Sequence, residues 1–249
     1  FIATVNTILY RNAHPIFVDC QKDNPNVDLE KIILFIKDKT FFKNRRSYNK
    51  KTKRKIKAVI LTHVFGNTLE FENLKKICKK KNIKIIEDAA EALGSKFEKK
   101  NHAGTFGDFG VLSFNINKVI TTAGGGAVFI KNKSDKKIAE LLIKQNKNND
   151  IFFHHSDIGY NYGMSNIEAA IGCAQLKKIK NILLSKKKIY EEYKFYFKSN
   201  QKIEMLKPSK FSNYWLNSLM IKKNISYSNL KNIIKKIENK GVQVRPIWY

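Results

Sequence analysis

The sequence predicts an α/β fold: a mostly parallel central sheet flanked by helices, with a smaller C-terminal α+β domain. Up to about residue 150, short apolar runs alternate with segments of helical periodicity. The strand–helix–strand spacing is typical of parallel units with buried strands. With 249 residues, of which 43% are hydrophobic, the chain is long enough to bury a sizeable core.

The expected elements of the first part follow in chain order. A strand is expected at residues 15–19 and an amphipathic helix at 28–37, where Leu29, Ile32, Ile33 and Ile36 share one face. Residues 41–57 are expected to form a basic loop. The remaining predicted elements are strands at 58–62, 83–87, 111–115 and 126–130, and a helix at 69–81.

The pattern changes after about residue 150, and we predict two domains, 1–180 and 181–249. Ser165 is expected to cap a helix that runs to about residue 179. A long Lys/Tyr-rich helix, a strand at 215–221, a helix from 228 and a strand at 242–245 follow. Because the chain starts at Phe1 and stops just after an apolar segment, we expect both domains to be truncated.

The charge favours nucleic-acid binding at first sight, since 48 Lys and Arg oppose 21 Asp and Glu, a net charge of +27. Only five of these cations are Arg, the residue on which specific nucleic-acid sites usually depend. Lys is enriched together with Asn and Ile, the residues of A/T-rich codons. Coding bias on solvated helix faces explains this better, so we expect no nucleic-acid partner.

Other partner classes are excluded more directly. No run approaches 18 consecutive apolar residues, so we expect no membrane span. The three cysteines are far apart, which argues against a disulfide framework and for a reducing compartment. His154 and His155 have no third ligand at a sensible spacing, so no metal is expected.

Ligands of parallel sheets bind at the carboxyl ends of the strands, here residues 63–67, 88–94 and 115–126. Asp88 follows an apolar strand. It could cap the next turn, the common role of Asp at such a position. It could also fix a cationic ring nitrogen through a charge-assisted hydrogen bond.

Lys118 leaves a predicted buried strand at the same end of the sheet. A lysine removed from water can attack a carbonyl and form a Schiff base. Gly124, Gly125 and Gly126 would let the backbone approach a ligand closely, although they could equally mark a tight strand entry. Ser113 could donate its hydroxyl to a phosphate.

Four ordered motifs carry a resemblance: His63-Val-Phe-Gly66, Glu87-Asp-Ala-Ala-Glu-Ala-Leu-Gly94, Gly107-Asp-Phe-Gly-Val-Leu-Ser-Phe-Asn-Ile-Asn-Lys118 and Gly159-Tyr-Asn-Tyr-Gly-Met164. They resemble the pyridoxal-phosphate-dependent sugar aminotransferases of the DegT/DnrJ/EryC1/StrS family, fold type I, over essentially the whole chain. The basic insertion and Ser212-Asn-Tyr-Trp-Leu-Asn217 further resemble members of the legionaminic-acid pathway type.

The resemblance implies catalytic and cofactor-binding roles. Lys118 matches the lysine that holds the cofactor and then moves the substrate proton. Asp88 matches the carboxylate paired with the pyridine nitrogen, which makes the ring an electron sink. Glu91 lies where the family has Gln or Glu near the 3-hydroxyl of the cofactor, and Ser113 matches a phosphate ligand.

Further roles involve the partner subunit and the substrate. Phe1 matches an aromatic ring stacked on the pyridine. Asn161 matches a residue that reaches the phosphate of the neighbouring subunit, which implies a homodimer with shared active sites. Arg245 is either a surface charge or a residue near the nucleotide-sugar pocket. His63 either contacts the substrate or is a structural histidine.

Two residues depart from the family pattern, since Gly163 stands where relatives usually have Arg, and Ala123 where they usually have Gly.

The implied reaction is cytoplasmic amino transfer, with glutamate as the donor, to a 4-keto-6-deoxy hexose on a nucleotide; a 3-keto hexose is the second choice. Such sugars enter surface polysaccharides or nonulosonic acids. The alternatives are a degenerate, non-catalytic or regulatory member and a basic nucleic-acid-binding protein.

Overall fold

The computed structural model describes residues 1–98, 101–149 and 151–248. The chain forms two compact units. The main unit comprises residues 18–190 and 207–216, and the small unit comprises residues 1–17, 191–206 and 217–249. The predicted domain boundary at residue 180 stays a prediction.

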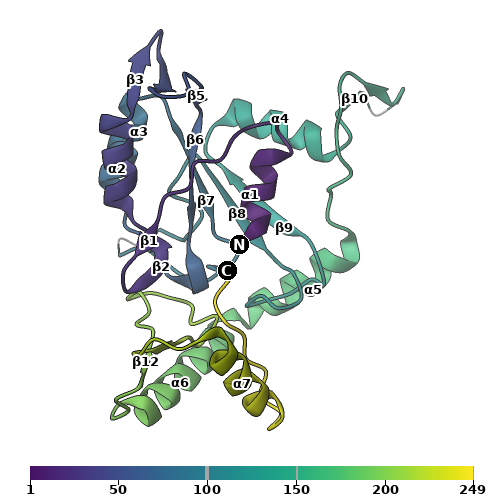
Figure 1. Ribbon diagram of the computed structural model, residues 1–249. Helices are drawn as coiled ribbons and strands as arrows, with labels where there is room; N and C mark the ends of the chain where they lie inside the picture. Colours follow the sequence, from purple (N-terminus) through teal and green to yellow (C-terminus); the bar gives the residue numbers. More distant parts are fainter. Residues whose placement is uncertain (99–100, 150, 249) are drawn as a thin grey trace. The chain divides into compact units, whose positions relative to one another are not determined.

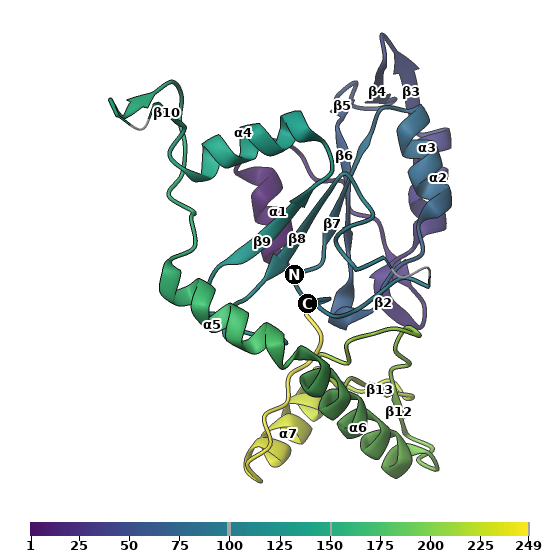
Figure 2. The same ribbon diagram turned by 180° about the vertical axis from the view of Figure 1, so that it is seen from behind.

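The main unit is built on a four-stranded sheet in the order β6 (Ala58–Thr62), β7 (Lys84–Asp88), β8 (Phe109–Ser113) and β9 (Gly126–Ile130). Strands β6, β7 and β8 are parallel, whereas β9 runs antiparallel to β8 (Figures 1 and 2). The short β8–β9 connection has no crossover helix, which a parallel neighbour would need. The predicted α/β class with a mostly parallel sheet is therefore confirmed.

Helices α2 (Leu29–Asp38) and α3 (Glu72–Lys80) pack side by side against one face of this sheet (Figure 1). The Asp28 side chain caps α2 by accepting hydrogen bonds from the backbone of its first turn. Ile32, Ile33 and Ile36 are buried from α2, as predicted, together with Leu61 of β6. This core also contains Leu69, Phe71, Leu74, Cys78, Ile83, Ile85 and Phe97. Burial of so many large apolar side chains provides the main driving force for folding of this unit.

The prediction of a loop at residues 41–57 is wrong, because this segment folds into a small antiparallel sheet of β3 (Thr40–Lys43), β4 (Arg46–Asn49) and β5 (Lys55–Ile56). We call these residues, 40–57, the basic sheet. Asn44 and Arg45 both have positive φ, the conformation of a tight hairpin turn. The rings of Phe41 and Tyr48 stack across the hairpin with centroids 5.3 Å apart. Local turn chemistry and a cross-strand aromatic pair override the polar composition.

Other segments also differ from the expectation. Residues 15–19 form no strand, and the hairpin of β1 (Cys20–Gln21) and β2 (Asn24–Val27) follows them. Helix α4 (Lys133–Ile143), capped by Asn132, was not predicted, nor was the pairing of β10 (Lys147–Asn149) with β11 (His154–His155). The expected helix after Ser165 is confirmed as α5 (Asn166–Lys177), whose start is a capping box of Ser165 and Glu168.

The small unit contains α1 (Ile2–Leu9), the end of α6 (Ile179–Phe197) and α7 (Tyr227–Glu238). Strands β12 (Ile203–Met205) and β13 (Leu219–Ile221) pair antiparallel, so the predicted strand at 215–221 is shorter than expected. Residues 242–245 form no strand, contrary to the prediction. Within the described ranges no helix is long and apolar enough to cross a bilayer, and no three His, Cys, Asp or Glu gather as metal ligands.

Gly110 allows strand β8 to pack closely against the backbone of Gly104. A Cβ atom added there would overlap the backbone of Gly104. We expect Gly110→Ala to lower the free energy of unfolding by about 1–3 kcal/mol, the usual cost of overpacking. Gly163→Ala is the matched control, since its added Cβ meets nothing within 4 Å. Equal urea midpoints for the two variants would contradict this account.

Candidate active site

The carboxyl ends of β7 and β8 place two predicted site residues on one face of the sheet. Asp88 pairs with Val111 in the parallel register, and Ser113 lies two residues further along β8. Because side chains alternate between faces, Asp88 and Ser113 share a face, whereas Glu87 points to the opposite one. Asp88 is half-buried, and its Oδ1 accepts a hydrogen bond from Ala90 N at 3.1 Å.

Lys118 lies in the loop that follows β8. Its backbone N–H donates to Asn115 O at 3.0 Å, which turns the chain back toward the sheet. Its side chain is only 14% exposed, and Nζ lies 3.8 Å from Glu91 Oε1. Nζ also lies 4.4 Å from the ring centroid of Trp215. The structure thus brings Lys118 and Glu91 close together, and the roles assigned to them stay predictions.

Glu91 is buried beside Lys118. Its Oε2 accepts a hydrogen bond from Phe65 N at 2.8 Å. Burial raises the pKa of Glu91 above its ordinary value, and the negative charge of Asp88 adds to this effect. The Phe65 N–H and the Lys118 ammonium oppose the increase without cancelling it. Glu91 therefore keeps its proton to a higher pH than an exposed glutamate does.

His63 is fully buried and pairs with Glu87. Its Nε2 donates to Glu87 Oε2 at 2.9 Å, and its ring packs edge-on against Phe97. Burial pushes the pKa of Glu87 upward, but His63 and the backbone N–H groups of Gly107 and Gly104 outweigh burial and hold this pKa below its ordinary value. His63 Nδ1 is buried and has no hydrogen-bond partner among the described residues. Of the two alternatives for His63, this burial favours the structural one.

The glycine-containing loop after Lys118 is attached to α5. Gln175 accepts a hydrogen bond from Thr121 N at 3.1 Å and donates one to Thr121 O at 2.6 Å. Ala123 has φ +68°, in the left-handed region that glycine favours. The methyl group of alanine adds about 1–2 kcal/mol of strain at such a position, which is consistent with the glycine that the resemblance implies here.

Three predicted residues lie on other segments. Asn161 is exposed and bridges to Lys144. Phe1 and Arg245 belong to the small unit. Phe1 is 64% exposed, and the centroid of its ring lies 5.3 Å from that of Trp248. Arg245 is also exposed. The roles assigned to these three residues stay predictions.

The sequence analysis missed two aromatic residues near Lys118. Phe65 supplies the backbone N–H that binds Glu91, from a backbone conformation with positive φ. Trp215 lies almost 100 positions further along the chain, and its ring packs 6.4 Å from that of Phe65. The Ser212-Asn-Tyr-Trp segment was noted only as part of the resemblance. Its contact with Lys118 depends on tertiary structure and has no local signal.

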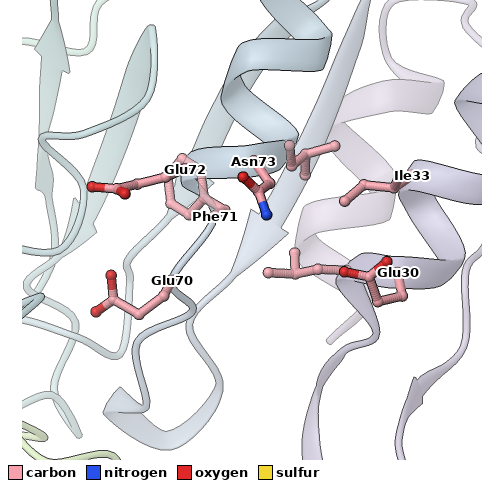
Figure 3. Close-up of a pocket in the computed structure, with 8 residues that line it drawn as sticks. Glu30, Ile33, Glu70, Phe71, Glu72 and Asn73 are labelled. Carbon is pink, nitrogen blue, oxygen red and sulfur yellow. The ribbon is translucent and has the colours of Figure 1, made fainter.

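A hollow elsewhere in the main unit lies between the N-terminal parts of α2 and α3 (Figure 3). Its lining includes the acidic residues Glu30, Glu70 and Glu72 and the apolar residues Ile33 and Phe71. It contains none of the predicted site residues. The hollow is therefore separate from the candidate site at the carboxyl ends of β7 and β8.

A half-buried lysine beside carboxylates at the carboxyl end of an α/β sheet is suited to bind a carbonyl cofactor, the arrangement expected of a fold type I aminotransferase. The comparison with known families agrees. The model of the DegT/DnrJ/EryC1/StrS aminotransferase family matches residues 1–249, and the chain belongs to this family.

Individual relatives are similar over the whole chain. GDP-perosamine synthase of Escherichia coli O157:H7 is 33% identical over 253 residues, which cover 100% of this chain and 63% of that protein. Helicobacter pylori PseC, an aminotransferase of pseudoaminic acid biosynthesis, is 26% identical with a TM-score of 0.83, covering 99% of this chain and 64% of the PseC chain. The chain thus spans somewhat less than two thirds of the length of these relatives.

A third similarity concerns the fold. The structure of E. coli GDP-4-keto-6-deoxy-D-mannose-3-dehydratase contains bound hydrated PLP. It is 24% identical to this chain, with a TM-score of 0.77, and the match covers 93% of this chain and 59% of the dehydratase. Together with the solved aminotransferases it confirms the predicted fold type I architecture.

The buried Glu87 carboxylate gives a stability prediction. Glu87→Gln removes the carboxylate that accepts a hydrogen bond from His63 and places an amide N–H₂ among backbone donors. We expect the free energy of unfolding to fall by about 3–5 kcal/mol, because the buried donors that now bind the Glu87 carboxylate would lose an acceptor. Urea unfolding at pH 7 measures the change. Glu98→Gln, in an exposed pair with Lys210, is the control and should change stability by less than about 1 kcal/mol.

The raised pKa of Glu91 gives a pH prediction. The folded chain binds this proton more tightly than the unfolded chain. The stability that the proton contributes is therefore complete below the unfolded-state pKa of about 4.5 and is lost as the pH rises through the folded-state pKa. The Glu91→Gln variant does not titrate at this position and so does not lose stability in this way. The melting temperature of the variant minus that of the wild type should therefore become more positive from pH 4.5 upward. A difference that stays flat or falls between pH 4.5 and 8 would refute the assignment.

Proposed function

We propose that this chain carries the active site of a pyridoxal phosphate-dependent aminotransferase that moves an amino group from glutamate to a nucleotide-linked 4-keto-6-deoxy hexose. The observation that supports this most directly is the position of Lys118 Nζ. It lies 3.8 Å from Glu91 Oε1, in the loop after the strand that ends at Ser113.

The residues present fit the cofactor. A hydrogen bond between an amine and a carboxylate is usually about 2.7–3.2 Å long, so the 3.8 Å separation leaves the Lys118 amine available for a carbonyl group. Asp88 offers a half-buried carboxylate for a ring nitrogen, and Ser113 a half-buried hydroxyl for a phosphate. The two side chains share one face of the sheet, as one bound molecule would require.

Each side chain would have a definite task. When bound, the cofactor supplies an electron sink for the carbon that loses its proton. Lys118 Nζ would hold the cofactor and, when free, carry the substrate proton. Asp88 would keep a proton on the ring nitrogen through a charge-assisted hydrogen bond. Glu91, next to Lys118 Nζ, would lie near the 3-hydroxyl of the cofactor, as the resemblance implies. Positioned proton transfer of the kind assigned to Lys118 contributes on the order of 10²–10⁴-fold to a rate.

The names of relatives support the substrate class. Helicobacter pylori UDP-4-amino-4,6-dideoxy-N-acetyl-beta-L-altrosamine transaminase is 29% identical over 260 residues and is named for a 4-amino sugar on UDP. We therefore favour amination at C4 over C3. We place the product in surface polysaccharide or nonulosonic-acid-type sugar biosynthesis, in line with the role of PseC in pseudoaminic acid biosynthesis.

We also propose a cytoplasmic homodimer in which Asn161 completes the site of the neighbouring subunit. The exposure of Asn161 supports this role, because a residue that reaches a partner must lie on the surface. Ile167 and Ile171 of α5 are exposed as well, at 76% and 41%. Exposed apolar side chains on one helix are typical of a subunit contact.

The proposed function predicts a spectrum. Addition of pyridoxal phosphate to the purified protein should produce the visible absorbance band of lysine-bound cofactor, and excess glutamate should convert it to the pyridoxamine form. Lys118→Arg should abolish the band and nearly all turnover, because arginine cannot bind the carbonyl. A folded protein with Lys118 intact and no band would favour the non-catalytic alternative.

The matched control is Lys75→Arg. Lys75 is also partly buried, donates to Phe106 O at 2.6 Å and has a pKa lowered by burial, so it is a second lysine of the main unit that is partly removed from water. The Lys75→Arg variant should keep the full band and full turnover. Retained amino transfer in Lys118→Arg would overturn the assignment of Lys118.

A further inference from the structure

Trp215 contacts Lys118 in two ways. Lys118 Nζ lies over its indole ring, 4.4 Å from the ring centroid, close enough for a cation–π interaction. Its Nε1–H donates a hydrogen bond of 2.8 Å to the carbonyl oxygen of Asn117, the residue before Lys118. One side chain therefore contacts both the amine of the lysine and the backbone from which this lysine projects.

Trp215 is itself held firmly. It is 7% exposed, and its backbone N–H donates to Asn213 Oδ1 at 2.9 Å. The Asn213 amide in turn donates to the carbonyl oxygens of Glu91 and Leu93, at 2.8 and 2.9 Å. Asn213 thus connects the segment that carries Trp215 to the turn that carries Glu91.

The backbone around this contact is unusual. Tyr214, between Asn213 and Trp215, has φ +52°, and Phe65, which binds Glu91, has φ +55°. Residues other than glycine adopt this conformation at a cost, and such residues concentrate at functional sites. A buried indole N–H needs an acceptor in any case, and here the acceptor is the carbonyl of the residue just before Lys118.

We infer that Trp215 is a positioning residue: it holds the Lys118 amine beside Glu91, at the place where the amine must meet the cofactor carbonyl. This inference rests on the proposed function. Trp215 does not itself react. Its indole face restrains Nζ, and its N–H restrains the preceding peptide, so the amine is kept close to the orientation needed for attack.

Positioning and charge predict opposite effects when the ring is removed. An aromatic face stabilises an ammonium ion relative to the neutral amine, and only the neutral amine attacks a carbonyl. If charge dominated, loss of the ring would speed the reaction of Lys118. If positioning dominates, as we infer, loss of the ring slows it. The direction of the change therefore separates the two.

The test measures how fast the apoprotein binds pyridoxal phosphate covalently. The visible band is followed after mixing, and the modified lysine is identified by borohydride reduction and peptide mass. Trp215→Leu removes both contacts and should slow band formation about tenfold, because the amine is no longer held in position. Trp215→Phe keeps a ring face but loses the N–H, and its rate should lie between those of Trp215→Leu and the wild type. In turnover assays, kcat should decrease, whereas KM for the sugar should change much less.

Phe106→Leu is the control for a merely structural loss. Phe106 is an aromatic residue packed against the main core, and Lys75 Nζ lies 3.3 Å from its ring centroid. This variant should lose stability but form the band on Lys118 at the wild-type rate. Wild-type or faster rates in both Trp215 variants would overturn the inference while leaving the proposed function intact. Absence of the band in the wild type would overturn both.

Discussion

The rest of the main unit depends on the fully buried carboxylate of Glu87. It accepts a hydrogen bond from His63 and three more from the backbone N–H groups of Gly104, Phe106 and Gly107. A buried carboxylate without such partners would cost several kcal/mol, so these contacts must form together. They join the ends of β6 and β7 to the turn that leads into β8. The turn leads directly into β8, whose pairing with β7 places Ser113 on the same face as Asp88.

The sequence predicted those parts of the fold in which local pattern and tertiary packing agree. Ile32, Ile33 and Ile36 show a helical period because one face of α2 is buried, and the periodicity reports that burial directly. The basic sheet shows the opposite case. Its strands are short and rich in Lys and Arg, so the sequence shows no strand-like hydrophobic pattern there. The sheet is stabilised instead by a turn with positive φ and by the Phe41–Tyr48 stack.

The candidate site was predictable to the extent that its residues stand next to strand ends. Asp88, Glu91 and Lys118 could be named because sheet topology brings consecutive strand ends together and because their motifs resemble a family. Trp215 and Phe65 could not, since their positions depend on contacts between segments far apart in the chain. His63 also stands at a strand end, but its burial depends on Glu87 and the turn after it, which no local pattern reveals.

The basic sheet has a consequence for work with the purified molecule. Three of the five arginines of the chain lie in it, and the segment contains no Asp or Glu. Such a concentration of cations retains polyanions by counterion release at low ionic strength. Nucleic acid fragments carried through purification would absorb in the ultraviolet and mimic a specific complex. A wash at about 1 M salt, where the Debye length is about 3 Å, separates this ion-exchange behaviour from true ligand recognition.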